Sequence, residues 1–361
     1  MINYYVLPHT LQFKRPARTS RGEYRDKKVW YVFLSVEPLS EELCLTYLKE
    51  PSRWGGCRIG VGEIAPLYDL SCDFVDNFEA VIGDCLQRCY ELQTNDAFIN
   101  YDVLQEFPSI LFGVETAWYS LHAPDGLALF DSDFSNAKRC IHINGLVWMS
   151  DLAEMERQAL EKIKLGFKCI KFKIGALDWH KELEIIERIR TRYSKDELEI
   201  RVDANGAFSM WDVFPVLERL NQLDVHSIEQ PIKAGQWDSM AELCRCSPIS
   251  IALDEELIGI HYLDGKHKLM QTICPQYIVL KPTLHGGFKG VDEWVMLAEE
   301  MRVGYWLTSA LESNVGLNAI AQKAALLNGA ERWQGLGTGQ LFVENIEGLG
   351  LSLEGEALWR F

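Results

Sequence analysis

The chain has 361 residues, of which 48% are apolar and 24% are charged, so it is long enough for a large core and for about two domains. Its formal charge of −16 includes no basic tract, which argues against nucleic acid or an anionic membrane as a partner. The start, MINYYVLPHTLQF, lacks the features of a secretory signal, and no apolar run approaches about 18 residues. We therefore expect a cytoplasmic protein with no nucleic-acid or membrane partner.

The first 135 residues have the pattern of a small α+β unit, in which strands precede helices. The apolar run VWYVFLSVE (29–37) predicts a strand, and a glycine-rich stretch follows at 53–67. Apolar residues at helical spacing predict helices at 75–92 and 108–123. The last part of the chain, GLGLSLEGEALWRF, predicts a further short strand or hairpin outside the second domain.

From about residue 140 the chain alternates between short apolar runs and amphipathic helices such as 150–166 and 181–193. Strands separated in this way favour a (β/α) barrel, although periodicity alone also fits a doubly wound sheet. Seven strand candidates occur: IHINGLVW (141–148), CIKFKIG (169–175), LEIRVDANG (198–206), VHSIEQP (225–231), ISIALDEE (249–256), YIVLKP (277–282) and GYWLTSALES (304–313).

Five predicted strands end in a conspicuous polar residue: Lys173, Asp203, Glu229, Asp254 and Lys281. The spacings between them are 30, 26, 25 and 27 residues, about one strand-and-helix unit each. All five should therefore lie at the carboxyl ends of successive strands, where barrel enzymes have their active sites. Any one of these residues alone is more typical of an interior ion pair or a solvated charge, but five in register favour an active site.

These residue types predict a particular chemistry. Three carboxylates that leave coordination positions open suit Mg²⁺, which can stabilise the enediolate formed when a proton is removed beside a substrate carboxylate. Lys171 and Lys173 share one face of their strand, and a metal ion together with a second ammonium group lowers the pKa of a lysine toward that of a general base. The lysine on the opposite side would act as a second base or stay charged.

The motifs KFK, RVDANGAF, IEQP, ALDEE and VLKP resemble those of the enolase superfamily, specifically its muconate lactonizing enzyme-like branch. GVGEIAPL (60–67) resembles part of the amino-terminal capping domain of that branch. The resemblance implies an α/β fold with a modified (β/α)7β TIM-type barrel at 136–339. It also implies an α+β capping domain at 1–135, completed by the C-terminal segment 340–361.

The resemblance also implies roles for single residues. Lys173 matches the general base, Lys281 matches the lysine on the opposite face, and Lys171 matches a supporting residue. Three residues match the ligands of Mg²⁺, for which Mn²⁺ would be a substitute: Asp203, Glu229 and Asp254.

Within the branch, two motifs resemble those of the o-succinylbenzoate synthases. These are SALESNVG (309–316) and ING (143–145), which make Ser309 and Asn144 candidate substrate-binding residues. The stretch GLGTGQLF lacks the D-x-D motif with which dipeptide epimerases grip a substrate amine. The implied reaction is the syn dehydration of 2-succinyl-6-hydroxy-2,4-cyclohexadiene-1-carboxylate to o-succinylbenzoate in menaquinone biosynthesis. Lys173 would move the proton, and Lys281 would stay charged beside the enediolate.

The cationic segment FKRPARTSRGEYR (13–25) corresponds to a loop over the barrel mouth in this branch. We hypothesise that Arg15, Arg18 or Arg21 attracts the small carboxylate substrate; a solvated loop without substrate contact is the alternative. Other functions also fit the residues. An N-acylamino acid racemase or a dipeptide epimerase would use both lysines as bases, and a catalytically inactive barrel would serve as a binding protein. No prediction of oligomeric state follows.

Overall fold

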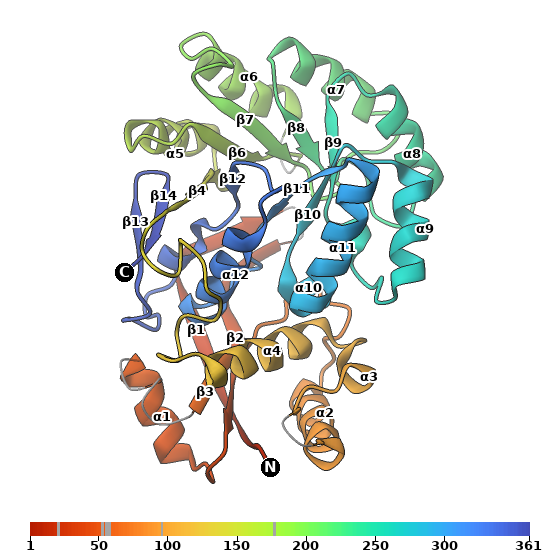
Figure 1. Cartoon of the computed structure of the whole chain (residues 1–361). Helices are drawn as coiled ribbons and strands as arrows, with labels where there is room; N and C mark the ends of the chain where they lie inside the picture. The colour runs from red at the N-terminus through yellow and green to blue at the C-terminus, as the bar shows by residue number, and fades with distance from the viewer. Residues whose placement is uncertain (20–21, 52–53, 55–58, 95–96, 176–177) are drawn as a thin grey trace.

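The computed structural model describes residues 1–19, 22–51, 54, 59–94, 97–175 and 178–361. A small antiparallel sheet with its own helices lies beside a ring of parallel strands that is surrounded by further helices (Figure 1). This arrangement confirms the predicted α/β fold of a TIM-type barrel with an α+β capping domain. Within the described residues, no helix combines the length and the apolar character needed to cross a membrane.

The capping sheet has three strands, and its central strand is apolar on both faces. β1 (Asn3–Thr19) and β3 (Ile59–Ile64) pair antiparallel with the two edges of β2 (Gly22–Ser35). Trp30 and its alternate neighbours pack against α2 and α4, whereas Tyr31 and its alternate neighbours pack toward α1 and the barrel. Both faces of β2 are therefore buried from Val29 to Ser35. The helices of this domain are α1 (Glu41–Lys49), α2 (Phe78–Leu92), α3 (Tyr101–Leu104) and α4 (Pro108–His122).

The glycines of GVGEIAPL allow α4 to lie directly on β3. A Cβ atom at Gly60 would stand 2.0 Å from the carbonyl oxygen of Ala117, and one at Gly62 would stand 1.9 Å from that of Gly113. Any side chain at either position would force the helix away from the strand. The motif therefore reflects close packing inside the capping domain.

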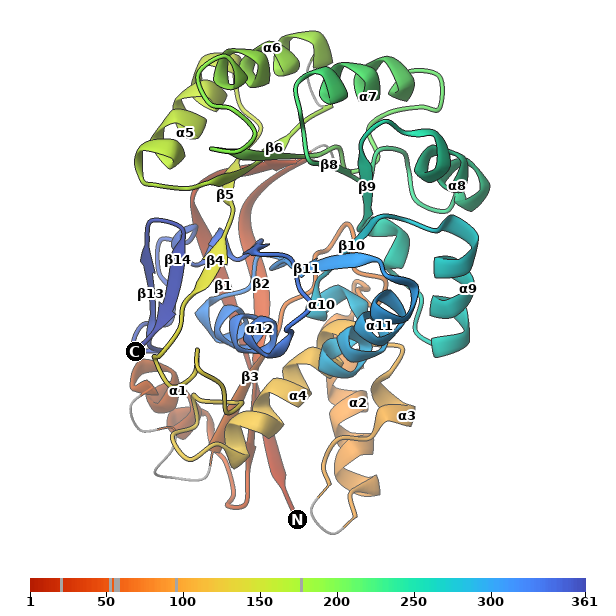
Figure 2. The same ribbon diagram turned by 45° about the horizontal axis from the view of Figure 1, so that its top comes forward.

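Seven parallel strands form the main sheet of the barrel, in chain order. They are β5 (Gly145–Val147), β6 (Cys169–Lys173), β7 (Glu199–Asp203), β8 (Ser227–Glu229), β9 (Ser250–Leu253), β10 (Tyr277–Leu280) and β11 (Gly304–Leu307). Figure 2 looks into the ring and shows helices on its outside. The barrel helices are α5 (Leu152–Lys164), α6 (Trp179–Arg190), α7 (Val213–Gln222), α8 (Trp237–Cys246), α9 (Leu263–Ile273), α10 (Pro282–His285), α11 (Gly287–Met301) and α12 (Asn314–Leu326), with short 3-10 turns η2 (Glu255–Leu257) and η3 (Gly337–Gln340).

Two short strands close the ring. β12 (Trp333–Gln334) runs parallel to β4 (Ile141–Ile143), and the N–H of Gly335 donates to the carbonyl of Leu307 at 2.7 Å. The predicted single strand at 141–148 is thus two strands, β4 and β5, that part at Asn144. The division has a simple cause, because β4 pairs with β12 and β14 whereas β5 pairs with β6.

The segment after residue 340 contacts both parts of the molecule. The N–H of Lys14 donates to the carbonyl of Leu341, and the N–H of Val343 donates to the carbonyl of Gln12, both at 2.8 Å. Further on, β13 (Leu351–Glu354) and β14 (Ala357–Arg360) form a hairpin. Because β14 pairs with β4 of the barrel, the assignment of 340–361 to the capping domain stays a prediction.

The described part of the segment 13–25, expected to be a loop, is a β-hairpin. β1 continues to Thr19 and β2 begins at Gly22, while residues 20–21 lie outside the described residues. The register shifts between Gln12 and Ala17, the stretch that contains Pro16. A proline lacks the N–H for a regular ladder, so an irregularity of this kind lets the strands continue past it.

Candidate active site

Six charged side chains gather at the carboxyl ends of five neighbouring barrel strands. The strand register pairs Lys173 of β6 with Asp203 of β7, and Asp203 with Glu229 of β8. Side chains at paired positions point to the same face of a sheet, so these three lie side by side inside the ring. The whole set is Lys171, Lys173, Asp203, Glu229, Asp254 and Lys281, each at most 8% exposed.

Ion pairs connect the lysines to the carboxylates. Lys171 Nζ lies 3.0 Å from Asp203 Oδ2 and 2.8 Å from Glu229 Oε2. Lys173 Nζ lies 2.7 Å from the same Asp203 oxygen. On the far side, Lys281 Nζ donates to Asp254 Oδ2 and stands 4.0 Å from Glu229 Oε1. The structure therefore brings all six predicted residues into one network.

Asn205 adds an amide to this network. Lys173 Nζ donates to Asn205 Oδ1 at 2.7 Å, and Asn205 Nδ2 donates to Glu255 Oε1 at 2.9 Å. The N–H of Asn205 also donates to Asp203 Oδ1 at 3.1 Å. These bonds fix the direction in which the ammonium group of Lys173 points.

The three carboxyl groups have different protonation equilibria. Burial disfavours the charged form of Asp203, but the ammonium groups of Lys171 and Lys173 outweigh it and hold the pKa of Asp203 well below its usual range. Burial and the charge of Asp203 raise the pKa of Glu229 to about 7. Burial also raises the pKa of Asp254, although Lys281 opposes this effect.

Two of the lysines are held in their charged form. Burial acts to lower the pKa of Lys171, but the charges of Asp203 and Glu229 outweigh it and raise that pKa above its ordinary value. The pKa of Lys281 is raised in the same way, against burial, by Asp254 and Glu229. The charges of the site thus largely compensate one another.

The carboxylates fit a hard divalent cation in their chemistry. Glu229 Oε1 and Asp254 Oδ1 are buried and have no hydrogen-bond partner among the described residues, so each retains lone pairs for a ligand. No three His, Cys, Asp or Glu side chains in the described ranges already form a metal-binding cluster. The lysines hold the carboxylates instead, so a cation would bind by exchanging with ammonium contacts such as that of Lys281 on Asp254.

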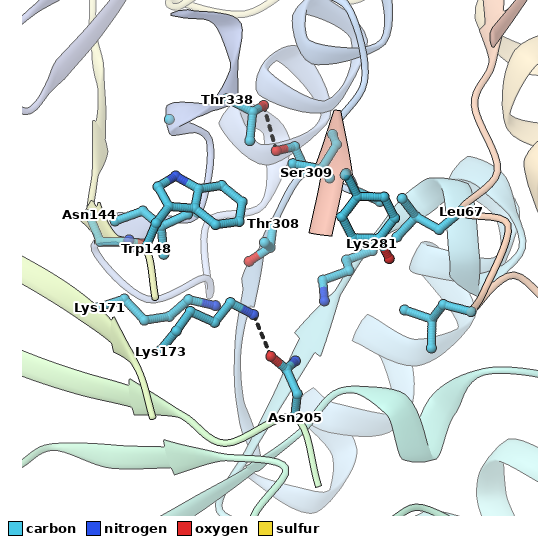
Figure 3. A pocket seen from close by; sticks show the side chains of 17 residues that line it. Leu67, Asn144, Trp148, Lys171, Lys173, Asn205, Lys281, Thr308, Ser309 and Thr338 are labelled. Atoms are coloured by element: carbon cyan, nitrogen blue, oxygen red, sulfur yellow. Dashed lines mark hydrogen bonds between the residues drawn. The ribbon is translucent and has the colours of Figure 1, made fainter. Parts of the chain in front are cut away.

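A pocket opens above this network, between the barrel and the capping domain. Lys171 and Lys173 enter it from one side and Lys281 from the other (Figure 3). Its walls combine apolar side chains with neutral polar groups, and no described Asp or Glu lines it. The lining residues are Tyr24, Leu67, Leu70, Asn144, Leu146, Trp148, Lys171, Lys173, Asn205, Lys281, Thr308, Ser309, Ala310, Leu311, Gly335, Gly337 and Thr338.

The predicted substrate-binding residues lie in different surroundings. Asn144, between β4 and β5, and Ser309, after β11, both line the pocket and are 3% and 6% exposed. Ser309 Oγ forms a hydrogen bond of 2.7 Å with Thr338 Oγ1 (Figure 3). Of these two residues, Thr338 belongs to the stretch GLGTGQLF, which lacks the D-x-D motif.

The arginines of the hairpin are not among the described pocket residues. Arg15 forms an exposed ion pair of 3.4 Å with Glu154 of α5. The backbone of Arg18 lies in β1 opposite Glu23. Arg21 lies outside the described residues, so the role predicted for Arg18 or Arg21 stays a hypothesis.

Several pocket residues were missed by sequence reasoning. Asn205 and Thr338 had a usable signal, since they lie in the singled-out stretches RVDANGAF and GLGTGQLF. Tyr24 and Leu67 also lie in singled-out stretches, FKRPARTSRGEYR and GVGEIAPL, whereas Leu70 had no signal. All three reach the pocket through packing of the capping domain on the barrel. Their side chains make the capping-domain wall of the pocket apolar apart from a phenol.

A capped barrel of parallel strands that carries carboxylates between facing lysines defines the class of this protein. The family model "Enolase C-terminal domain-like" matches residues 154–345. The chain is 40% identical, over 93% of both sequences, to the o-succinylbenzoate synthase of Desulfotalea psychrophila. The chain therefore belongs to the enolase superfamily.

Solved structures agree with this family. The crystal structure of MenC from Desulfotalea psychrophila matches with a TM-score of 0.80 and 35% identity, covering 99% of both chains. A dipeptide epimerase from Enterococcus faecalis, complexed with Mg and the dipeptide L-Leu-L-Tyr, matches with a TM-score of 0.79 over 99% of this chain and 96% of that one. Its identity of 17% shows a shared fold only.

Proposed function

We propose that the protein is an o-succinylbenzoate synthase, a carbon–oxygen lyase. The observation that carries the proposal is the lining of the pocket, where lysines face each other among apolar and neutral polar groups. Such a pocket suits a substrate with carboxylates and no ammonium group. The near full-length similarity to a synthase supports the same substrate, 2-succinyl-6-hydroxy-2,4-cyclohexadiene-1-carboxylate.

The lysines would carry the proton chemistry. Lys173, oriented by Asp203 and Asn205, takes the α-proton of the substrate and returns it to the hydroxyl group that leaves on the same face. A C–H and a C–O bond break, the ring becomes aromatic, and one water molecule departs. Lys281 stays protonated on the other face and stabilises the charge of the enediolate. Lys171 supports Lys173 by holding Asp203 and Glu229 in place.

Asp203, Glu229 and Asp254 would hold Mg²⁺, with Mn²⁺ as a substitute. When bound, the ion supplies positive charge to the substrate carboxylate as its α-proton leaves. The unpartnered oxygens of Glu229 and Asp254 and the Mg complex of a relative with the same fold support this assignment.

We further propose that the enzyme acts in menaquinone biosynthesis and in the cytoplasm. Asn144 and Ser309 are the proposed polar contacts of the substrate inside the pocket. A racemase or epimerase with two catalytic lysines is the second candidate function, because Lys173 and Lys281 do face each other. The hydroxyl pair of Ser309 and Thr338 favours the synthase over an epimerase, since hydroxyl groups offer an ammonium group no countercharge.

The test is the loss of ultraviolet absorbance as the cyclohexadiene is converted to o-succinylbenzoate. We expect rapid turnover with Mg²⁺, none with excess chelator, and a loss of about 10²–10⁴-fold or more in kcat for Lys173→Ala. Lys168→Ala, which changes an exposed lysine just before β6, is the matched control and should keep full activity. A folded, Mg²⁺-binding protein that leaves this substrate unchanged but exchanges the α-hydrogen of N-acyl amino acids or dipeptides would refute the synthase and establish the second candidate.

A further inference from the structure

Two buried charges of the capping domain bind the backbone around the segment 309–313, at the barrel mouth. Lys27 of β2 is 5% exposed, and its Nζ donates to the carbonyl of Ala310 at 2.5 Å. Glu63 of β3 is fully buried and accepts from the N–H of Ser313 at 2.7 Å and from that of Gly316 at 2.8 Å. The strands β2 and β3 of the capping domain thus hold consecutive parts of a segment that belongs to the barrel.

The segment forms a wall of the pocket. Ser309, Ala310 and Leu311 line it directly. Leu311 has a φ of +65°, in the left-handed region that a leucine rarely adopts and that surrounding contacts must therefore hold. The side chain of Leu311 keeps its position only as long as the backbone on both sides of it is fixed.

The barrel fixes the same segment from within. Glu312 is fully buried, and its Oε2 accepts from the N–H of Ala310 at 2.7 Å while its Oε1 accepts from the hydroxyl of Thr283. Ala310 is therefore held by its N–H from the barrel and by its carbonyl from Lys27. Breaking the Lys27 contact would leave a buried carbonyl unpaired beside a strained residue.

The choice of residue at position 27 also points to this role. Packing alone would be satisfied by an apolar side chain of similar length, such as methionine. A buried ammonium group costs free energy through desolvation, and burial lowers the pKa of Lys27 to about 8. The ammonium group of Lys27 donates a hydrogen bond to a backbone carbonyl of the pocket wall, an interaction that methionine could not form.

We propose that Lys27 and Glu63 are positioning residues, which hold the segment 309–313 in the strained conformation that shapes the substrate pocket. The capping domain then acts on substrate binding through the backbone of the barrel, in addition to the side chains with which it lines the pocket. The catalytic lysines and carboxylates lie on or directly after other strands, β6 to β10.

The first test is amide hydrogen exchange, which requires no activity. Lys27→Met should raise exchange at residues 309–316 by about tenfold or more and leave the strands β6 to β10 unchanged. Lys28→Met, which removes an ion pair with exposed Glu79, is the matched control and should change neither region. If Lys27→Met does not fold, Glu63→Gln carries the test, because it keeps the shape and one acceptor oxygen.

The second test is kinetic and rests on the proposed function. Lys27→Met should raise KM by about tenfold and keep kcat within about threefold. In a Leu311→Gly background the left-handed conformation costs little, because glycine adopts positive φ about as readily as negative φ. The same substitution at Lys27 should therefore raise KM less than about threefold in that background. Unchanged exchange at 309–316, or an unchanged KM with a lowered melting temperature, would overturn the proposal. If the wild type lacks synthase activity, the exchange experiment alone decides it.

Discussion

Lys173 and Lys281 carry the same functional group in different surroundings. Lys173 Nζ contacts Asp203 and the amide of Asn205, both at 2.7 Å. Lys281 Nζ contacts Asp254 and has no neutral acceptor among its described partners. An asymmetric pair of this kind suits a reaction with one base and one fixed charge.

Arginine substitutions separate these two roles, because a guanidinium keeps the positive charge and does not act as a base at neutral pH. We expect Lys281→Arg to lower kcat by no more than about tenfold to a hundredfold relative to wild type. Lys173→Arg should lower kcat by about 10²–10⁴-fold or more. The measurement is steady-state turnover of the cyclohexadiene for both variants. Equal losses in the two variants would show that both lysines act as bases and would favour the racemase.

At the scale of elements, the contact between α4 and β3 makes a sharp prediction about two glycines. A Cβ at Gly62 would stand 1.9 Å from the carbonyl oxygen of Gly113, whereas one at Gly83, exposed on α2, would meet nothing within 4 Å. Gly62→Ala should therefore lower the free energy of unfolding by about 3 kcal/mol. Gly83→Ala should raise it by about 1 kcal/mol, since alanine favours the helix. Chemical denaturation of the two variants beside wild type measures both changes, and a tolerated Gly62→Ala would contradict the close contact.

At the scale of the whole molecule, a second buried carboxyl group joins the two domains. Glu115 of α4 accepts hydrogen bonds from the N–H groups of Phe288 and Lys289, at the start of α11. Burial raises the pKa of Glu115 from 4.5 to about 8, against those hydrogen bonds. The folded protein therefore binds a proton that the unfolded chain has already released at neutral pH.

The sign of the pH dependence follows from this shift. The contribution of Glu115 to stability is fully present below about pH 4.5 and is lost as the pH rises toward about 8. Glu115→Gln cannot titrate, so its stability should fall less than that of wild type over this range, as measured by urea unfolding at several pH values. Exposed Glu79 is the control position, and Glu79→Gln should not flatten the curve in this way. Parallel curves for wild type and Glu115→Gln would disprove the assignment.

The sequence predicted the parts of the molecule that depend on local pattern. Strand spacing alone places Asp203, Glu229 and their partners at one end of the ring, because parallel strands share an edge. It did not predict the hairpin at 13–19 and 22–25, since Pro16 and several charges are typical of a loop and only pairing across the bulge makes it a strand. Nor could it find Lys27, whose role depends on a contact with Ala310, 283 positions further along the chain.

The hydrogen bonds between residues 12–14 and 341–343 affect the order in which the molecule can form. Phe13 packs on Phe342 with ring centroids 4.7 Å apart, so β1 completes its contacts only with a segment that is made much later in synthesis. Contacts of such sequence separation form slowly. On the ribosome, the apolar face of the hairpin β1–β2 that packs toward the barrel stays incompletely covered until residues 341–343 have emerged. During this interval the nascent chain is most exposed to aggregation and to binding by chaperones.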